Sequence, residues 1–202
     1  MDERKKIRNT SAPTPYLFNL PADYFELHFS PDQGPVLMLL PQVIKWNEEL
    51  MRKDDALRTK FTRTMLARAA VMDVPVMKSH ADNELCNRVE RAQVRSGIAD
   101  GASFHGPWEA ASFVTGSGHQ LRFGVYIKAK DRGLAMVVAN TTAAAVRETI
   151  TLNSTSLDAA GVHPGPKATL INAFTGAETS IPGEAPVQLE LAPDDLQYIV
   201  WE

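Results

Sequence analysis

The chain has 202 residues, 44% of them apolar and 22% charged, which is the composition of an ordinary globular protein. Its formal net charge of -3 excludes the strongly basic balance of nucleic-acid-binding proteins, so we predict no nucleic-acid partner. The uninterrupted apolar runs of the sequence, such as residues 36–40, are far too short to cross a bilayer, so we predict no membrane contact.

The first residues of the chain and its cysteine content bear on the compartment. The charged start is not followed by an apolar segment, which is not the pattern of a secretory signal. Cys86 is the single cysteine, so an internal disulfide is excluded. As written, the sequence predicts a cytoplasmic protein; the alternative is a secreted one, if the chain is part of a longer polypeptide.

The N-terminal part begins with residues 1–15, which we predict to be a disordered lead because they are charged and then broken by Pro13 and Pro15. Residues 24–29 alternate between apolar and polar, which predicts a half-buried strand. Residues 36–40 are compatible with a second, buried strand.

From residue 42 the apolar period becomes helical. One face is predicted to carry Trp46, Leu50, Leu57, Phe61, Met65 and Met72. Asp54 and Asp55 interrupt this stripe and are expected to cap a helix over residues 56–72. The stripe is a core face or, alternatively, a docking surface for a partner helix, and the core interpretation is the commoner one. A second, shorter helix is predicted over residues 83–94, followed by a loop. We expect residues 16–106 to form one mixed strand and helix region.

Residues 107–202 are predicted to form an antiparallel β-sandwich domain, because short strands alternate with turns rich in glycine and proline. The predicted strands are residues 108–114, 120–130, 134–140, 145–152, 168–172, 187–191 and 196–201. Hairpin turns are expected at residues 116–118 and 131–133. The predicted fold class is therefore α+β, with an N-terminal strand and helix region followed by a C-terminal antiparallel β-sandwich.

Chemical motifs are weak throughout the sequence. The histidines lack the spacing of metal ligands, and the glycines of residues 115–118 are not followed by the lysine of a phosphate-binding loop, so we predict no metal and no cofactor. Asp100, Ser103 and His105 are the residue types of a hydrolase triad, but the Gly-x-Ser-x-Gly elbow is missing. The catalytic residues, if there are any, stay unassigned.

Tryptophan offers the one candidate for ligand binding. Exposed indole rings stack on the apolar faces of sugars. Trp46 belongs to the helical stripe, and Trp201 lies on a terminal strand with apolar residues on both faces. Trp108 follows a Gly-Pro turn, so we take Trp108 as the candidate carbohydrate-binding residue.

Residues 133–142, in which Gly133 leads into an apolar strand ending in Asn140-Thr-Thr, resemble a strand in the C-terminal β-sandwich of TIM-barrel glycoside hydrolases of the α-galactosidase and α-amylase kind. The later segments have a similar order: an alternating strand, a strand reaching Phe174-Thr-Gly176, and Leu191-Ala-Pro-Asp194 before the closing strand. The resemblance covers residues 107–202.

This resemblance implies a sandwich that packs against a catalytic barrel, on a partner chain or in a longer protein. The catalytic carboxylates of that family lie on the barrel strands, and a barrel takes roughly 250 residues, so no catalytic residue is carried over to this chain.

Three functions follow from the sequence. The first is a non-catalytic accessory module associated with glycoside hydrolases, which supports a catalytic domain and contacts carbohydrate. The second is a small glycosidase-like hydrolase with its carboxylates between the two halves of the chain. The third is a structural or assembly protein, since β-sandwiches are reused for adhesion.

Overall fold

The computed structural model describes residues 53–74, 76, 78, 81–99, 101–129, 133–184 and 186–202. The predicted disordered lead, the two predicted N-terminal strands, and Trp46 and Leu50 lie outside these residues. Within them the α+β fold class is confirmed: two helices precede a region of two antiparallel sheets. Among the described residues no helix has the length and apolar character to cross a bilayer.

Two long helices form one layer of the molecule, and each begins at an aspartate. Helix α5 (Asp55–Ala70) starts where the Asp54 carboxylate accepts a hydrogen bond from the Leu57 amide, at 2.9 Å. In helix α6 (Asn83–Ser96), the Asp82 carboxylate accepts from two amides of the first turn. Such caps satisfy amides that the helix itself leaves without partners. Gly97 ends α6 in the left-handed conformation, with φ of 72°.

Of the predicted stripe, Phe61, Met65 and Met72 are buried and Leu57 is half-buried. The helix ends at Ala70, two residues earlier than predicted, so Met72 lies in the turn that follows it, and other faces of α5 are buried as well.

The C-terminal region contains a six-stranded and a three-stranded sheet, both antiparallel. The larger sheet has the order β1 (Ser103–His105), β3 (Arg122–Ile127), β4 (Leu134–Ala139), β9 (Leu196–Trp201), β6 (Lys167–Asn172) and β7 (Glu178–Pro182). The smaller sheet has the order β2 (Val114–Gly116), β5 (Val146–Leu152) and β8 (Val187–Leu191). Two short helices, α7 (Pro107–Ala110) and α8 (Ser154–Ala159), connect strands.

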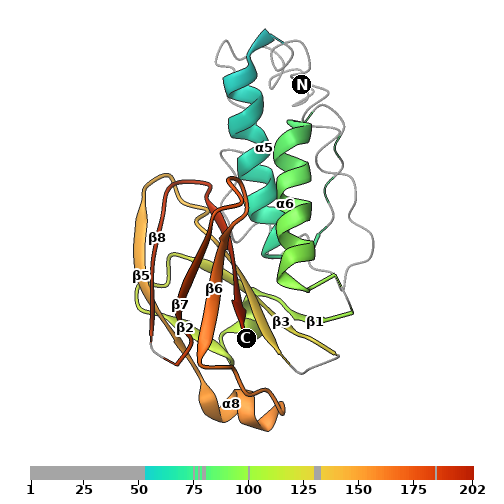
Figure 1. Cartoon of the computed structure of the whole chain (residues 1–202). Helices are drawn as coiled ribbons and strands as arrows, with labels where there is room; N and C mark the ends of the chain where they lie inside the picture. The colour runs from blue at the N-terminus through green and yellow to red at the C-terminus, as the bar shows by residue number, and fades with distance from the viewer. Residues whose placement is uncertain are drawn as a thin grey trace, which may run out of the picture.

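Strand β4 shows how the layers are stacked, because all six of its residues are buried. Ala135 and Val137 point into a core shared with α5 and α6, whereas Met136 and Val138 point into a second core shared with the three-stranded sheet. Side chains alternate across a strand, so a central strand covered on both faces reads as one apolar run. The helices, the large sheet and the small sheet are therefore three successive layers (Figure 1).

The structure corrects one predicted strand and adds others. Residues 108–114 were expected to be extended, but α7 occupies the first of them, because Pro107 has the fixed φ of a first helical residue. Only Val114 of this range belongs to a strand, β2. Strand β7 and helix α8 have no counterpart among the predicted elements. The other predicted strands correspond to β3, β4, β5, β6, β8 and β9, with ends that differ by at most three residues.

Candidate functional site

The candidate site lies around Trp108 on α7, the short helix between β1 and β2. The Trp108 side chain is 45% exposed, and it is one of two large apolar side chains at the surface of the described residues, with Val94 of α6. Gly106 supports the indole ring: a Cβ atom on Gly106 would lie 2.6 Å from the nearest ring carbon. The ring therefore rests on the main chain of Gly106, which restricts where it can move while leaving part of it in solvent.

Two polar side chains flank Trp108 in the sequence and contact each other. The imidazole Nδ1 of His105 lies 3.4 Å from a carboxylate oxygen of Glu109, and its ring lies 4.9 Å from the ring of Phe113. His105 is fixed by β1, which pairs with β3. This segment thus carries an exposed indole, a carboxylate and an imidazole within five residues, which supplies an apolar ring together with hydrogen-bonding groups of the kind that sugar-binding sites use. We call Trp108, His105 and Glu109 the Trp108 surface.

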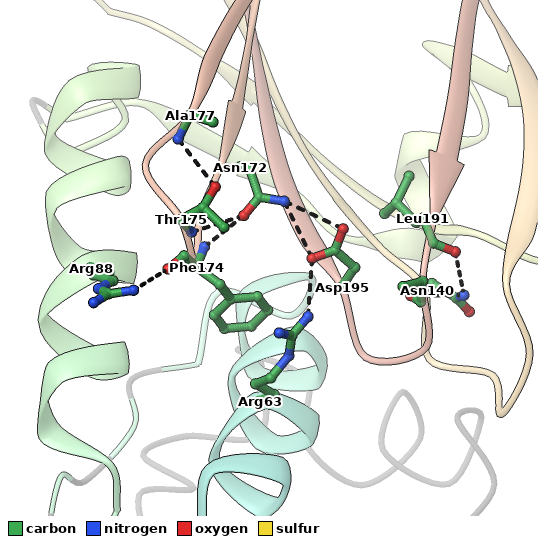
Figure 2. A network of polar contacts seen from close by, with 10 residues as sticks. Arg63, Arg88, Asn140, Asn172, Phe174, Thr175, Ala177, Leu191 and Asp195 are labelled. Atoms are coloured by element: carbon green, nitrogen blue, oxygen red, sulfur yellow. Dashed lines mark hydrogen bonds and ion pairs between the residues drawn. The ribbon is translucent and has the colours of Figure 1, made fainter.

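A second group of polar residues joins α5 to the sandwich. Figure 2 shows the Arg63 guanidinium of α5 directed at the Asp195 carboxylate, at 3.3 Å. The same guanidinium lies 4.5 Å above the centre of the Phe174 ring. Asn172 donates to both oxygens of Asp195 and accepts from the amides of Phe174 and Thr175. These contacts connect the helix to the turn after β6 and to the start of β9.

Helix α6 also contacts the turn after β6, where Arg88 donates a hydrogen bond to the Phe174 carbonyl at 3.1 Å (Figure 2). Asp194, with a positive φ of 55°, faces α5 beside Asp195. Burial raises the pKa of Asp194, while a hydrogen bond from Thr64 and the charges of Arg68, Lys60 and Arg63 oppose that rise. Burial also lowers the pKa of Arg68, and the Asp194 charge counteracts this. The helix layer and the β9 entry are thus held together by opposite charges.

The motif that carried the family resemblance has a structural role. Asn140 is fully buried at the end of β4, and its Nδ2 donates to the carbonyls of Ala144, Leu191 and Ala192 at 2.8 to 3.1 Å. Its Oδ1 accepts from the amide and the hydroxyl of Thr142. One side chain therefore ties β4 to the loop that follows it and to the turn after β8.

Glu148 of β5 is a second buried carboxylate, and like the Asn140 amide it binds the main chain. Its Oε1 accepts hydrogen bonds from the amides of Gln120 and Leu121. Its Oε2 is buried beneath Gly116 and has no hydrogen-bond partner among the described residues, and Oε1 lies beneath Gly118. A side chain at either glycine would meet the carboxylate, at 2.3 Å for Gly116. The predicted hairpin turn at residues 116–118 is wrong, because the strands on either side of it, β2 and β3, belong to different sheets. The close approach of Glu148 explains why glycines occupy positions 116 and 118.

Other polar, aromatic and thiol side chains of the described residues have structural roles. Asp100, one of the triad residue types, lies outside the described residues. Asp82 caps α6 and accepts a hydrogen bond from the Thr59 hydroxyl at 2.8 Å. Trp201 is buried and its indole Nε1 donates to the Gly183 carbonyl. Cys86 is buried, which raises the pKa of its thiol. In the described part of the chain, no three His, Cys, Asp or Glu side chains gather as metal ligands do.

The sequence singled out Trp108 as a ligand-binding candidate and His105 as a possible triad member, but it did not single out Glu109 or the network at Asp195. Glu109 could have been considered with Trp108, because it is the next residue in the sequence. The contact between Arg63 and Asp195 spans 132 residues, and no local pattern indicates such a pair. Comparison of the sequence with protein-family models and with curated proteins gave no match.

Proposed function

We propose that this chain is a non-catalytic accessory module associated with glycoside hydrolases, which supports a catalytic domain and contacts carbohydrate through the Trp108 surface. The observation that carries the proposal is the position of Trp108, a half-exposed indole held against the main chain of Gly106. A ring that is already ordered loses little conformational entropy when a sugar stacks on it. The neighbouring His105 and Glu109 can exchange hydrogen bonds with sugar hydroxyls.

The supporting role rests on the way the layers are joined. Arg63 and Arg88 come from different helices and both contact the turn at Phe174, so both helices are joined to the large sheet through this turn. A rigid body with two packed cores is what a domain needs in order to hold a neighbouring domain in place. The resemblance of residues 107–202 to the sandwich of barrel glycoside hydrolases names the kind of neighbour.

For the hydrolase alternative, the carboxylates to consider are Asp194 and Asp195, because they lie where the two halves of the chain meet. A glycosidase needs one carboxylic acid and one carboxylate that reach the substrate. Asp195 is buried and bound to Arg63 and Asn172, and Asp194 accepts from Thr64. These carboxylates are engaged in joining the layers, which favours the non-catalytic function.

The test is a glycan-array screen of the 202-residue protein together with three variants. Trp108→Ala removes the ring, Trp108→Phe keeps a smaller ring, and Gly106→Ala keeps the indole but displaces it from its support. We expect selective binding that falls at least tenfold in Trp108→Ala, or about 1.4 kcal/mol, with smaller losses in the other two variants. Val94→Ala, which trims the other exposed apolar side chain on α6, is the matched control and should bind as the parent does.

Two results would contradict the proposal. The carbohydrate-binding role of the Trp108 surface is refuted if the protein binds no glycan on the array. It is also refuted if a folded Trp108→Ala variant still binds. Hydrolysis of aryl glycosides by the purified chain would instead support the hydrolase alternative, and its loss in Asp194→Asn would identify the carboxylate concerned. If the chain is silent in both assays, the structural or assembly function is the better supported one.

A further inference from the structure

A cavity of about 160 Å³ lies between α5 and α6, beside the segment that joins them. Helix α5 contributes Ala69 and Ala70 to its wall, and α6 contributes Cys86 and Val89. Protein interiors are normally filled to the density of organic crystals. Here the two alanines are too short to fill the space between the helices, which leaves a void within a layer that is otherwise well packed.

The charges at the edge of this cavity compensate each other. The Lys78 ammonium donates to a carboxylate oxygen of Glu90 at 2.7 Å and to the Asn87 side chain at 3.0 Å. Lys78 and Glu90 both line the cavity and both are partly exposed, so they mark its opening to solvent. Because burial raises the pKa of the Cys86 thiol, that group is neutral as well. The side chains of α5 and of Cys86 and Val89 make the apolar part of the lining, and Lys78, Glu90 and Gln93 bring polar groups to it. A ligand in this cavity therefore meets a mainly apolar lining and, among the described residues, no uncompensated charge.

We propose that the cavity between α5 and α6 binds a neutral, compact, apolar molecule, such as a monocyclic aromatic compound. Its size sets this class: an apolar protein cavity of about 150 Å³ is known to accept benzene. A charged ligand would have to break the Lys78–Glu90 ion pair or leave its own charge without a partner, which is costly in an apolar site. The site lies on the helix layer and is independent of the Trp108 surface.

Cys86 supplies the assay, because it is the single cysteine of the chain and lines the cavity. The rate of its modification by methyl methanethiosulfonate, a small thiol reagent, is measured over a series of toluene concentrations. A ligand that occupies the site slows modification by the factor 1 + [L]/Kd. We expect a saturable effect that reaches about elevenfold when toluene is at ten times its Kd, together with a rise in the unfolding midpoint.

The variant Ala70→Leu fills the cavity and should remove the effect of toluene on both measurements. The matched control is Ala56→Leu, the same change at an exposed position of α5, where the toluene effect should be that of the parent. If Ala70→Leu does not unfold cooperatively, Ala69→Leu makes the same test from the neighbouring wall position. The proposal is overturned if toluene leaves the modification rate unchanged, or if it protects Cys86 equally in the filled variant.

Discussion

The most specific prediction concerns Asn140, because its fully buried amide donates hydrogen bonds to three carbonyls. The variant Asn140→Asp has nearly the same shape, but it replaces the donating Nδ2 group with a carboxylate oxygen. That oxygen would face the carbonyls of Ala144, Leu191 and Ala192 at distances where hydrogen bonds now lie. Attraction becomes repulsion at three contacts, and a charge is introduced where the parent has none.

The magnitude follows from the contacts that are lost. Each hydrogen bond contributes about 0.5–1.5 kcal/mol net, and a buried group left without its partner costs about 1–3 kcal/mol. For three carbonyls we expect Asn140→Asp to lower the free energy of unfolding by about 3–5 kcal/mol, a large share of the roughly 5–15 kcal/mol of a typical domain. For a chain of this size the melting temperature should then fall by about 6–20 °C.

Urea unfolding at pH 7, followed by tryptophan fluorescence and circular dichroism, measures this change. The control is Asn83→Asp, the same chemical substitution at the exposed first residue of α6, where a negative charge is tolerated or mildly favourable. We expect that control to lie within about 0.5 kcal/mol of the parent. A loss below about 1 kcal/mol in Asn140→Asp would refute the account of Asn140 as the residue that ties β4 to its neighbours.

Three further predictions concern stability. Arg63→Lys keeps the charge but loses the planar contact with Phe174, so we expect the free energy of unfolding in urea to fall by about 0.5–1 kcal/mol. The control is Arg147→Lys in the exposed pair with Glu190, which should change nothing measurable. Equal effects of the two substitutions would contradict the role of Arg63. Gly165→Ala places a Cβ 1.5 Å from the main-chain oxygen of Glu202 and should break the hydrogen bond from the Glu202 amide to the Lys167 carbonyl. We expect the free energy of unfolding to fall by about 1–2 kcal/mol in the same assay. An unchanged unfolding midpoint would show that the end of β9 shifts freely. Asp73 is exposed overall, but partial desolvation in the fold raises its pKa, against the opposing hydrogen bond from Tyr126. Folding therefore favours its protonated form, and its ionisation slightly lowers stability as pH rises above the ordinary aspartate value. Asp73→Asn, which suits the positive φ of 51°, should therefore be more stable than the parent at pH 7 and equal to it near pH 3; a variant less stable at pH 7 would contradict this sign.

Local signals made much of the fold predictable. An aspartate before an apolar helical stripe located the start of α5 at Asp54. The apolar run of residues 134–139 identified a strand, and the structure shows why the run is continuous: β4 is covered on both faces and buries every side chain. Strand β7 was missed because it lies at the sheet edge with mostly exposed residues, where alternation of apolar and polar side chains is not needed. Helix α7 was missed because four residues are too few to show a helical period.

The residues of the candidate site and of the layer junction were also only partly predictable from the sequence. Trp108 could be chosen from the sequence because an indole after a Gly-Pro turn has little chain around it to bury it. The contacts of Asp195 could not be chosen, because its partners Arg63 and Asn172 come from a distant helix and another strand. Two adjacent aspartates at a strand entry look alike whether they serve a turn, a layer junction or catalysis. Only the packing of α5 against β9 decides what surrounds them.

The contrast between these two regions is the physical basis for placing function at the Trp108 surface. A binding site must offer groups that a ligand can reach and that do not already satisfy one another. At the layer junction the charges are paired and Asp195 is buried, so a ligand would have to displace the half-buried Arg63 from Asp195 to reach that carboxylate. Around Trp108 the indole is partly in solvent, and its position against Gly106 is set by the main chain before any ligand arrives. Carbohydrate binding at Trp108 therefore requires no rearrangement of the two cores that hold the sandwich together.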